Sequence, residues 1–182
     1  MSSQKRGNGS DLAKQGPRGW LCQTAGAAAP FTNEGGSAPP KAHAVTSVGA
    51  TFNWPVRVYW EDTDAGGIVF YANYLKFFER ARTEWLRSLG IEQQQLKDAT
   101  GGMFVVAETS IRYLRPARLD DELIVTASVH ESGRAAMTIW QQALLKGTPI
   151  CEGKIRIGWV NAASLQAARI PQNIIESLRV KP

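Results

Sequence analysis

The residue types best suited to chemistry lie in one turn, which holds Asp62 and Asp64 and ends in the paired glycines Gly66 and Gly67. A helix-like pattern begins a few residues later, near Tyr71, so a carboxylate is placed beside a helix N-terminus. Backbone N–H groups in a first helical turn lack intrahelical partners, and the helix dipole adds a partial positive charge there. Such an end can hold a developing oxyanion while an aspartate attacks a carbonyl carbon or deprotonates a water aimed at it. The pattern therefore suits chemistry on a carbonyl compound.

The residue types alone leave other interpretations of this turn open. Asp62 and Asp64 are also typical turn or cap residues, which accept hydrogen bonds from backbone N–H groups, and either could be the working carboxylate. The glycines allow close approach of a ligand to the backbone, so Gly67 is a candidate substrate contact. Glu79 lies about two helical turns after Tyr71 and could approach the site, although the charge run around it is typical of a solvated helix face.

Other kinds of catalytic site lack support in the sequence. The domain's one histidine, His130, stands next to Glu131 in an alternating run, where a structural role with a local hydrogen bond is expected. No Gly-x-Ser-x-Gly elbow, zinc-ligand spacing or phosphate-binding glycine loop occurs. Cys22 and Cys151 make no disulfide framework. This usage favours a reducing, cytoplasmic compartment, with Cys151 as a buried small residue.

The composition of the chain changes near residue 53. Residues 1–53 are rich in Gly, Ser, Ala and Pro and carry five basic and two acidic residues, a net of +3 out of the whole chain's +5. We therefore expect a disordered, low-complexity N-terminal extension over 1–53 and one folded domain over 54–182. The nearly neutral domain shows no basic stripe, which argues against nucleic-acid binding. No apolar run approaches the roughly 18 residues of a membrane span, so stable membrane insertion is not expected.

The elements around the turn predict an α+β fold. A strand over 55–60 feeds the turn, and apolar residues at spacings of three and four predict a long helix from Tyr71 to about Leu89, ended by Gly90. A short helical or irregular segment, four antiparallel strands and a last short helix follow at 91–100, 104–113, 122–131, 135–145, 150–160 and 171–178. One long helix wrapped by a curved antiparallel sheet is the hotdog arrangement. Its unpaired edge strands favour pairing between chains, so a homodimer or homotetramer is expected.

The turn and the helix after it also resemble a known family signature. The run from Trp60 to Leu86, WEDTDAGGIVFYANYLKFFERARTEWL, is similar to that of the 4-hydroxybenzoyl-CoA thioesterase group of hotdog proteins. Within that group it most resembles the Tol-Pal-associated acyl-CoA thioesterases of Gram-negative bacteria. The resemblance continues through FVV at 104–106 and YLRPARLDD at 113–121, and it covers about residues 54–178.

This resemblance implies hydrolysis of acyl-CoA thioesters without a metal or a cofactor. In the family motif the catalytic acid is the second of the pair, here Asp64, acting as nucleophile or general base. Asp62 is then structural, and the backbone amide at Tyr71 polarises the thioester carbonyl. Many Tol-Pal-associated members carry His at the position of Tyr71, whereas the 4-hydroxybenzoyl-CoA enzymes carry Tyr there, as this chain does. The preferred length or aromatic character of the acyl group is therefore left open.

Coenzyme A carries phosphates, and four arginines are candidates to bind them by charge: Arg112, Arg115, Arg118 and Arg134. Each of them also fits ordinary solvation at a strand end. A second class of function is a non-hydrolytic hotdog module that binds acyl carrier protein or an envelope or division partner. A hotdog dehydratase fits less well, because its usual second catalytic group, a histidine near the helix, is missing.

Overall fold

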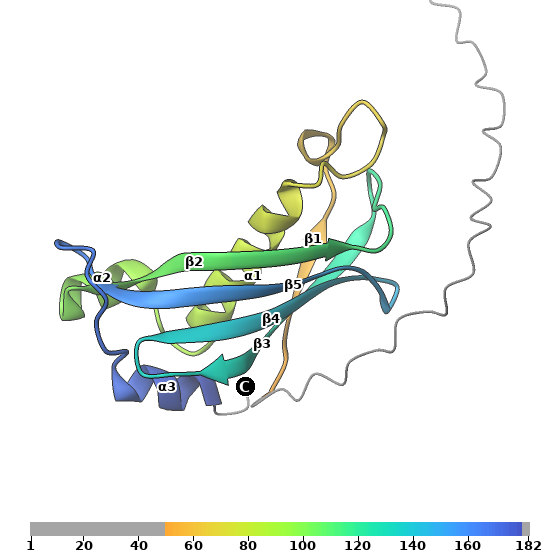
Figure 1. Ribbon diagram of the computed structural model, residues 1–182. Helices are drawn as coiled ribbons and strands as arrows, with labels where there is room; N and C mark the ends of the chain where they lie inside the picture. Colours follow the sequence, from red (N-terminus) through yellow and green to blue (C-terminus); the bar gives the residue numbers. More distant parts are fainter. Residues whose placement is uncertain (1–49, 180–182) are drawn as a thin grey trace, which may run out of the picture. The chain divides into compact units, whose positions relative to one another are not determined.

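A curved antiparallel sheet with one long helix across its face makes up the described part of the protein (Figure 1). The computed structural model describes residues 50–179, so the predicted extension over 1–53 lies almost wholly outside the described residues. In chain order the elements are β1 Phe52–Arg57, the 3-10 helix η1 Trp60–Asp62, α1 Asn73–Ser88, α2 Gln93–Thr100, β2 Gly102–Tyr113, β3 Glu122–Ser132, β4 Ala136–Leu145, β5 Thr148–Asn161 and α3 Gln172–Arg179.

The strands follow the order β1-β3-β4-β5-β2, and every neighbouring pair is antiparallel. Short turns join β3, β4 and β5, whereas β2 forms the far edge against β5. Within the described residues β2 has one strand partner, and a bulge between Val106 and Glu108 shifts its register against β5. The antiparallel sheet and the single long helix confirm the predicted α+β class.

The helix α1 packs its apolar face against β1, β3 and β4. Its buried apolar residues recur at spacings of mostly three and four, namely Tyr74, Phe77, Phe78, Ala81, Trp85 and Leu86. Alternate residues of β3 are buried beneath it, namely Leu123, Val125, Ala127 and Val129. Neither α1 nor the other helices within residues 50–179 are long and apolar enough to cross a membrane.

The C-terminus of α1 ends as the sequence predicts. Gly90 has a φ of +74°, which favours glycine, and its N–H donates to the Arg87 carbonyl at 2.9 Å. The next N–H, of Ile91, donates to the Leu86 carbonyl at 2.9 Å. These two bonds form the Schellman motif, which satisfies carbonyl groups at the end of the helix.

Two boundaries near the turn differ from the prediction. The first strand ends at Arg57, and Trp60 opens η1 with 78% of its surface exposed, so Trp60 does not continue the buried face of Val56. The reason is local, because the Asp62 carboxylate accepts the Tyr59 N–H and bends the chain there. The helix α1 begins at Asn73, two residues after the predicted start.

Gln141 is a polar side chain that lies fully buried between α1 and the sheet. Its amide nitrogen donates to the carbonyl oxygens of Phe78 at 3.0 Å and Thr126 at 3.3 Å, and its oxygen accepts from the Arg82 guanidinium at 2.7 Å. Burial lowers the pKa of Arg82, and the Glu79 carboxylate opposes that shift. Gln141 therefore joins α1 to β3 and β4 and gives a partly desolvated cation its polar partner.

Replacing Gln141 with methionine is expected to lower the free energy of unfolding by about 2–4 kcal/mol. Methionine has a similar volume, but it leaves the Arg82 guanidinium and the Phe78 carbonyl without this partner. Gln142→Met is the matched control, because the Gln142 side chain makes no hydrogen bond within the described residues while its backbone N–H donates to Thr126. Urea unfolding at an unchanged m-value measures both variants. Equal midpoints for the two variants would contradict the role of Gln141.

Candidate active site

Asp62 lies at the end of η1 and is buried. Its carboxylate accepts the Tyr59 N–H at 2.9 Å. Its backbone carbonyl accepts the Phe70 N–H at 2.8 Å and the side-chain amide of Asn73 at 3.0 Å. Asp62 thereby ties the segment after β1 to the first residue of α1, and its carboxylate accepts the N–H of Tyr59, the N-cap of η1, as the acid of a capping box does.

Asp64 lies on the loop that follows, and its side chain is exposed. An isolated antiparallel bridge between Thr63 and Val69 closes this loop, and the Asp64 N–H donates to the Ile68 carbonyl at 3.0 Å. The Asp64 Oδ1 atom accepts the Gly66 N–H at 2.8 Å, whereas Oδ2 accepts no hydrogen bond within the described residues. One carboxylate oxygen is therefore held, and the other is available to attack a carbon or to take a proton.

The paired glycines shape this loop in different ways. A Cβ on Gly66 would lie 3.0 Å from the Asp64 Oδ1 atom, so a side chain there would push against the carboxylate. Gly67 has a φ of +69°, and its N–H donates to the Asp64 carbonyl at 2.9 Å. The Gly67 amide is thus engaged in the turn, and a contact between Gly67 and a substrate stays a prediction.

The segment that leads into α1 holds the predicted carbonyl-polarising amide. The Asn73 N–H donates to the Phe70 carbonyl at 2.9 Å, and Ala72 has a φ of −73° and a ψ of −19°. This pattern is that of a type I turn over residues 70–73. Within the described residues, the N–H groups of Tyr71 and Ala72 donate no hydrogen bond. Two backbone donors are therefore available at the positive end of a 16-residue helix.

Tyr113, at the end of β2, holds this segment from the sheet side. Its hydroxyl donates to the Tyr71 carbonyl at 3.1 Å, and its ring packs edge-on against the Tyr71 ring at a centroid distance of 6.2 Å. Burial raises the pKa of the neighbouring Tyr74 to about 12 and raises the pKa of Tyr113, so both phenols stay protonated near pH 7. The sequence carries no signal for the bond to Tyr71, because it joins residues 42 positions apart.

Two of the four candidate arginines, Arg112 and Arg115, make contacts with β5 near the end of β2. Arg112 forms an ion pair with Glu152 at 3.0 Å, across the β2–β5 pairing. Arg115 donates to the Pro149 carbonyl at 3.0 Å. These contacts fit the structural interpretation of both residues.

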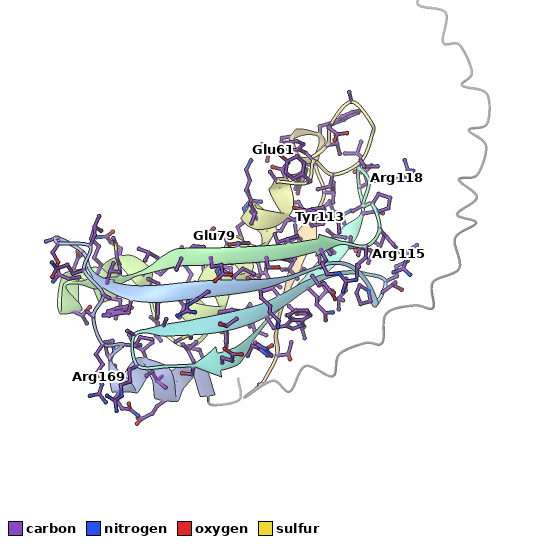
Figure 2. All side chains as sticks on the ribbon, viewed as in Figure 1. Glu61, Glu79, Tyr113, Arg115, Arg118 and Arg169 are labelled. Atoms are coloured by element: carbon purple, nitrogen blue, oxygen red, sulfur yellow. The ribbon has the colours of Figure 1, made fainter. Side chains whose placement is uncertain are left out.

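The other two candidate arginines lie in different parts of the molecule. Arg118 follows Ala117, whose carbonyl accepts the Val69 N–H from the Asp64 loop at 2.9 Å. Figure 2 shows Arg118 at the same end of the molecule as Glu61 of η1. Arg134 instead lies in the turn between β3 and β4. Among the four candidates, Arg118 is therefore the one tied to the loop that carries Asp64.

Glu79 and His130 make their contacts outside this site. Glu79 is exposed and accepts a hydrogen bond from Thr83 at 2.7 Å, and Figure 2 shows it midway along the molecule. His130 has its Nε2 atom 3.7 Å from the Glu131 carboxylate, which is too long for a hydrogen bond, and its Nδ1 atom is buried without a partner in the described residues. The local hydrogen bond predicted for His130 is therefore wrong.

Cys151 is buried in β5, as the sequence predicts. Burial raises the pKa of its thiol to about 12, so the thiol is not a nucleophile near pH 7. Among residues 50–179, no group of three or more His, Cys, Asp or Glu side chains is arranged to hold a metal ion.

The chain matches a family model described as the thioesterase-like superfamily over residues 58–178, and it belongs to that superfamily. It is 40% identical over 124 residues to the acyl-CoA thioesterase YbgC of Haemophilus influenzae, an alignment that covers 68% of this chain and 90% of that protein. It is 38% identical over 130 residues to the acyl-CoA thioester hydrolase YbgC of Escherichia coli O157:H7, covering 70% of this chain and 96% of that protein. A crystal structure of a probable thioesterase from Bartonella henselae matches with a TM-score of 0.64 and 31% identity, covering 67% of this chain and all of that one.

These matches confirm the hotdog fold and the family resemblance that the sequence predicts. The matched range of 58–178 contains the two aspartates, the start of α1 and the strands β2 to β5. The particular roles of Asp64, Gly67 and Tyr71 stay predictions.

Proposed function

We propose that this protein hydrolyses acyl-CoA thioesters to a free acid and coenzyme A. One observation carries the proposal: a carboxylate with a free oxygen, on Asp64, and an unpartnered backbone donor, at Tyr71, lie on one hydrogen-bonded segment. The Phe70 N–H bond to the Asp62 carbonyl joins the two halves of that segment. The acyl-CoA thioesterases to which the chain is similar support the choice of substrate.

In the proposed reaction the thioester oxygen accepts the Tyr71 N–H, which stabilises the oxyanion as it forms. The Asp64 carboxylate either attacks the carbonyl carbon or takes a proton from the water that attacks it. Collapse of the tetrahedral intermediate breaks the C–S bond, and coenzyme A leaves. In the nucleophilic route, water then cleaves the acyl anhydride on Asp64. Both routes consume one water, give the same products and need no metal or cofactor.

We assign the phosphates of coenzyme A to Arg118, because its neighbour Ala117 is bonded to the Asp64 loop. A guanidinium matches the geometry of phosphate oxygens. The preference of the site for acyl length and for aromatic acyl groups depends on which residues cover it.

The proposed active form is a homodimer or a homotetramer. Five aromatic side chains around the site are exposed in the single chain, namely Tyr59, Trp60, Phe70, Tyr71 and Tyr113. Exposed apolar patches mark interfaces, and the edge strand β2 offers unpaired backbone groups to a second copy. A covering chain would also exclude bulk water from Asp64 and strengthen the hydrogen bond from the Tyr71 amide.

The proposed location of the protein is the cytoplasm. The free thiol of Cys151 supports this location.

A second candidate function is binding of acyl carrier protein, or of an envelope or division partner, without hydrolysis. One observation favours it: the Asp64 carboxylate accepts the Gly66 N–H and so stabilises its own loop. This structural role explains an aspartate at that position without any catalysis. The exposed aromatic side chains would then form a docking surface for a protein.

Release of free coenzyme A from a panel of aliphatic and aromatic acyl-CoAs tests these two functions. We expect the wild type to turn over at least one of these substrates, because the two groups that the reaction needs are present. A wild type that is inert on the whole panel would refute hydrolysis and favour the binding module.

The same preparation, measured by light scattering, should show a mass of two or four chains of 19.9 kDa. A monomer that is fully active would remove the need for a covering chain.

A further inference from the structure

The Tyr113 hydroxyl makes a contact to which the proposed reaction gives no role. It donates to the Tyr71 carbonyl at 3.1 Å, so it joins the end of β2 to the segment that leads into α1. Burial raises the pKa of Tyr113, so the phenol keeps its proton and stays a donor near pH 7. Figure 2 shows Tyr113 at the same end of the molecule as Glu61 of η1. The bond therefore reaches the segment that carries the proposed oxyanion donor.

The Tyr71 carbonyl belongs to the same peptide unit as the Ala72 N–H. A peptide unit is planar and trans, so its carbonyl and its N–H point in opposite directions. A bond that fixes the Tyr71 carbonyl thus also fixes the direction of the Ala72 N–H. That N–H donates no hydrogen bond within the described residues, and Ala72 is only partly buried. Tyr113 therefore holds a free backbone donor in one orientation.

The preceding peptide unit is held in a similar way. Its carbonyl, of Phe70, accepts the Asn73 N–H at 2.9 Å, and its N–H, of Tyr71, is the proposed oxyanion donor. Ala72 has right-handed helical backbone angles, a φ of −73° and a ψ of −19°. Successive N–H groups in such a turn face the same side, as they do in the first turn of a helix. Two neighbouring free donors, each in a peptide unit whose carbonyl is hydrogen-bonded, therefore point the same way.

We propose, as an extension that rests on the proposed hydrolysis, that the Ala72 N–H is a second donor to the oxyanion and that Tyr113 is its positioning residue. The Tyr113 bond acts in two ways. It orients the peptide unit before the substrate binds, so no reorganisation is needed when charge develops on the thioester oxygen. It also polarises the peptide unit, because hydrogen bonds in a chain strengthen one another.

Tyr113→Phe removes the hydroxyl and keeps the ring, which packs against the rings of Tyr71 and Tyr74. We expect kcat on the best acyl-CoA of the panel to fall about five- to tenfold, with KM within about twofold of the wild type, because the oxyanion forms only after the substrate has bound. An active wild type whose kcat is unchanged in Tyr113→Phe would overturn this role and leave the proposed hydrolysis standing. A wild type that is inert on the whole panel would overturn both.

The matched control is Tyr74→Phe, which removes a phenol hydroxyl from the neighbouring buried ring. We expect it to lower the melting temperature and to leave kcat within about twofold of the wild type. Tyr113→Phe should show the reverse, because the Tyr113 side chain is half-exposed and its hydroxyl contacts the oxyanion segment. Equal losses of kcat in the two variants would show that any perturbation of this aromatic cluster slows the enzyme, which contradicts a positioning role for Tyr113.

Infrared difference spectra separate positioning from a structural effect. An acyl-CoA of the panel, isotopically labelled at the thioester carbonyl carbon, is bound to the slow variant Asp64→Asn. Adding Tyr113→Phe should raise the stretching frequency of the bound carbonyl, because a weaker Ala72 donor polarises it less. Adding Tyr74→Phe should leave the frequency unchanged. The same frequency with and without the Tyr113 hydroxyl would show that Tyr113 does not act through the oxyanion donors.

Replacing Ala72 with lactic acid tests the second donor itself, because the backbone ester keeps the methyl group and lacks the N–H. We expect kcat to fall about 10²-fold in a protein that still folds, as its melting temperature will show. Adding Tyr113→Phe to the ester protein should change kcat by less than about twofold, because the donor through which Tyr113 acts is already gone. An ester protein as active as the wild type, or losses that multiply, would overturn the proposal.

Discussion

Asp64→Asn is expected to lower kcat on acyl-CoA by at least about 10³-fold in a protein that still folds. The amide oxygen of asparagine can accept the Gly66 N–H in place of the Asp64 Oδ1 atom, which accepts it at 2.8 Å, so the turn is kept. Asparagine carries no negative charge and cannot act as nucleophile or base. Initial rates at saturating substrate measure the loss, and an unchanged melting temperature shows that the loss is chemical.

The matched control is Asp62→Asn, which makes the same chemical change two residues earlier. Asp62 is buried and its carboxylate accepts the Tyr59 N–H, so the variant buries an amide in place of that carboxylate. We expect it to lower the free energy of unfolding by about 1–3 kcal/mol and to change kcat by only a few-fold. A folded Asp62→Asn protein without activity, next to an active Asp64→Asn protein, would show that the two roles are reversed.

The sheet and the long helix are predictable from sequence because their signals are local. Apolar residues repeat along α1 from Tyr74 to Leu86 with the period of a helix, and Gly90 ends it with a backbone conformation that glycine favours. The alternation of apolar residues at Val56 and Val58 continues to Trp60 in the sequence, so it predicts a strand that includes Trp60. In the structure the Asp62 carboxylate accepts the Tyr59 N–H, and the chain bends before Trp60. A side-chain bond to the backbone thus overrides the strand pattern.

The candidate site is only partly predictable, because its decisive features are long-range. Asp62 and Asp64 have the same chemistry in the sequence, and only burial separates them. The bond from Tyr113 to the Tyr71 carbonyl depends on where β2 ends relative to α1. Charge alone likewise groups Arg118 with Arg134, which the fold places in the turn between β3 and β4. The family resemblance selects Asp64 and the Tyr71 amide where these physical patterns leave a choice.

Tyr71→Pro is expected to lower kcat by about 10²–10³-fold, because proline lacks the N–H that would bind the oxyanion. The substitution suits the backbone at this position. Tyr71 is the second residue of the type I turn closed by the bond from the Asn73 N–H to the Phe70 carbonyl, and proline is favoured there. The Tyr71 N–H donates no hydrogen bond in the described residues, so no bond within the fold is lost. The carbonyl that accepts from Tyr113 also remains.

Tyr71→Ala separates the role of the amide from that of the ring. It keeps the N–H and removes the side chain, 62% of which is exposed in the single chain. We expect kcat to stay within about tenfold of the wild type and KM to rise, because the ring would contribute to binding both the substrate and the transition state. The proline variant lacks the ring as well as the N–H, so its KM should rise as in the alanine variant and its kcat should fall far below that of the alanine variant. If both variants are equally inactive, or if the proline variant is fully active, the Tyr71 amide is not the oxyanion donor.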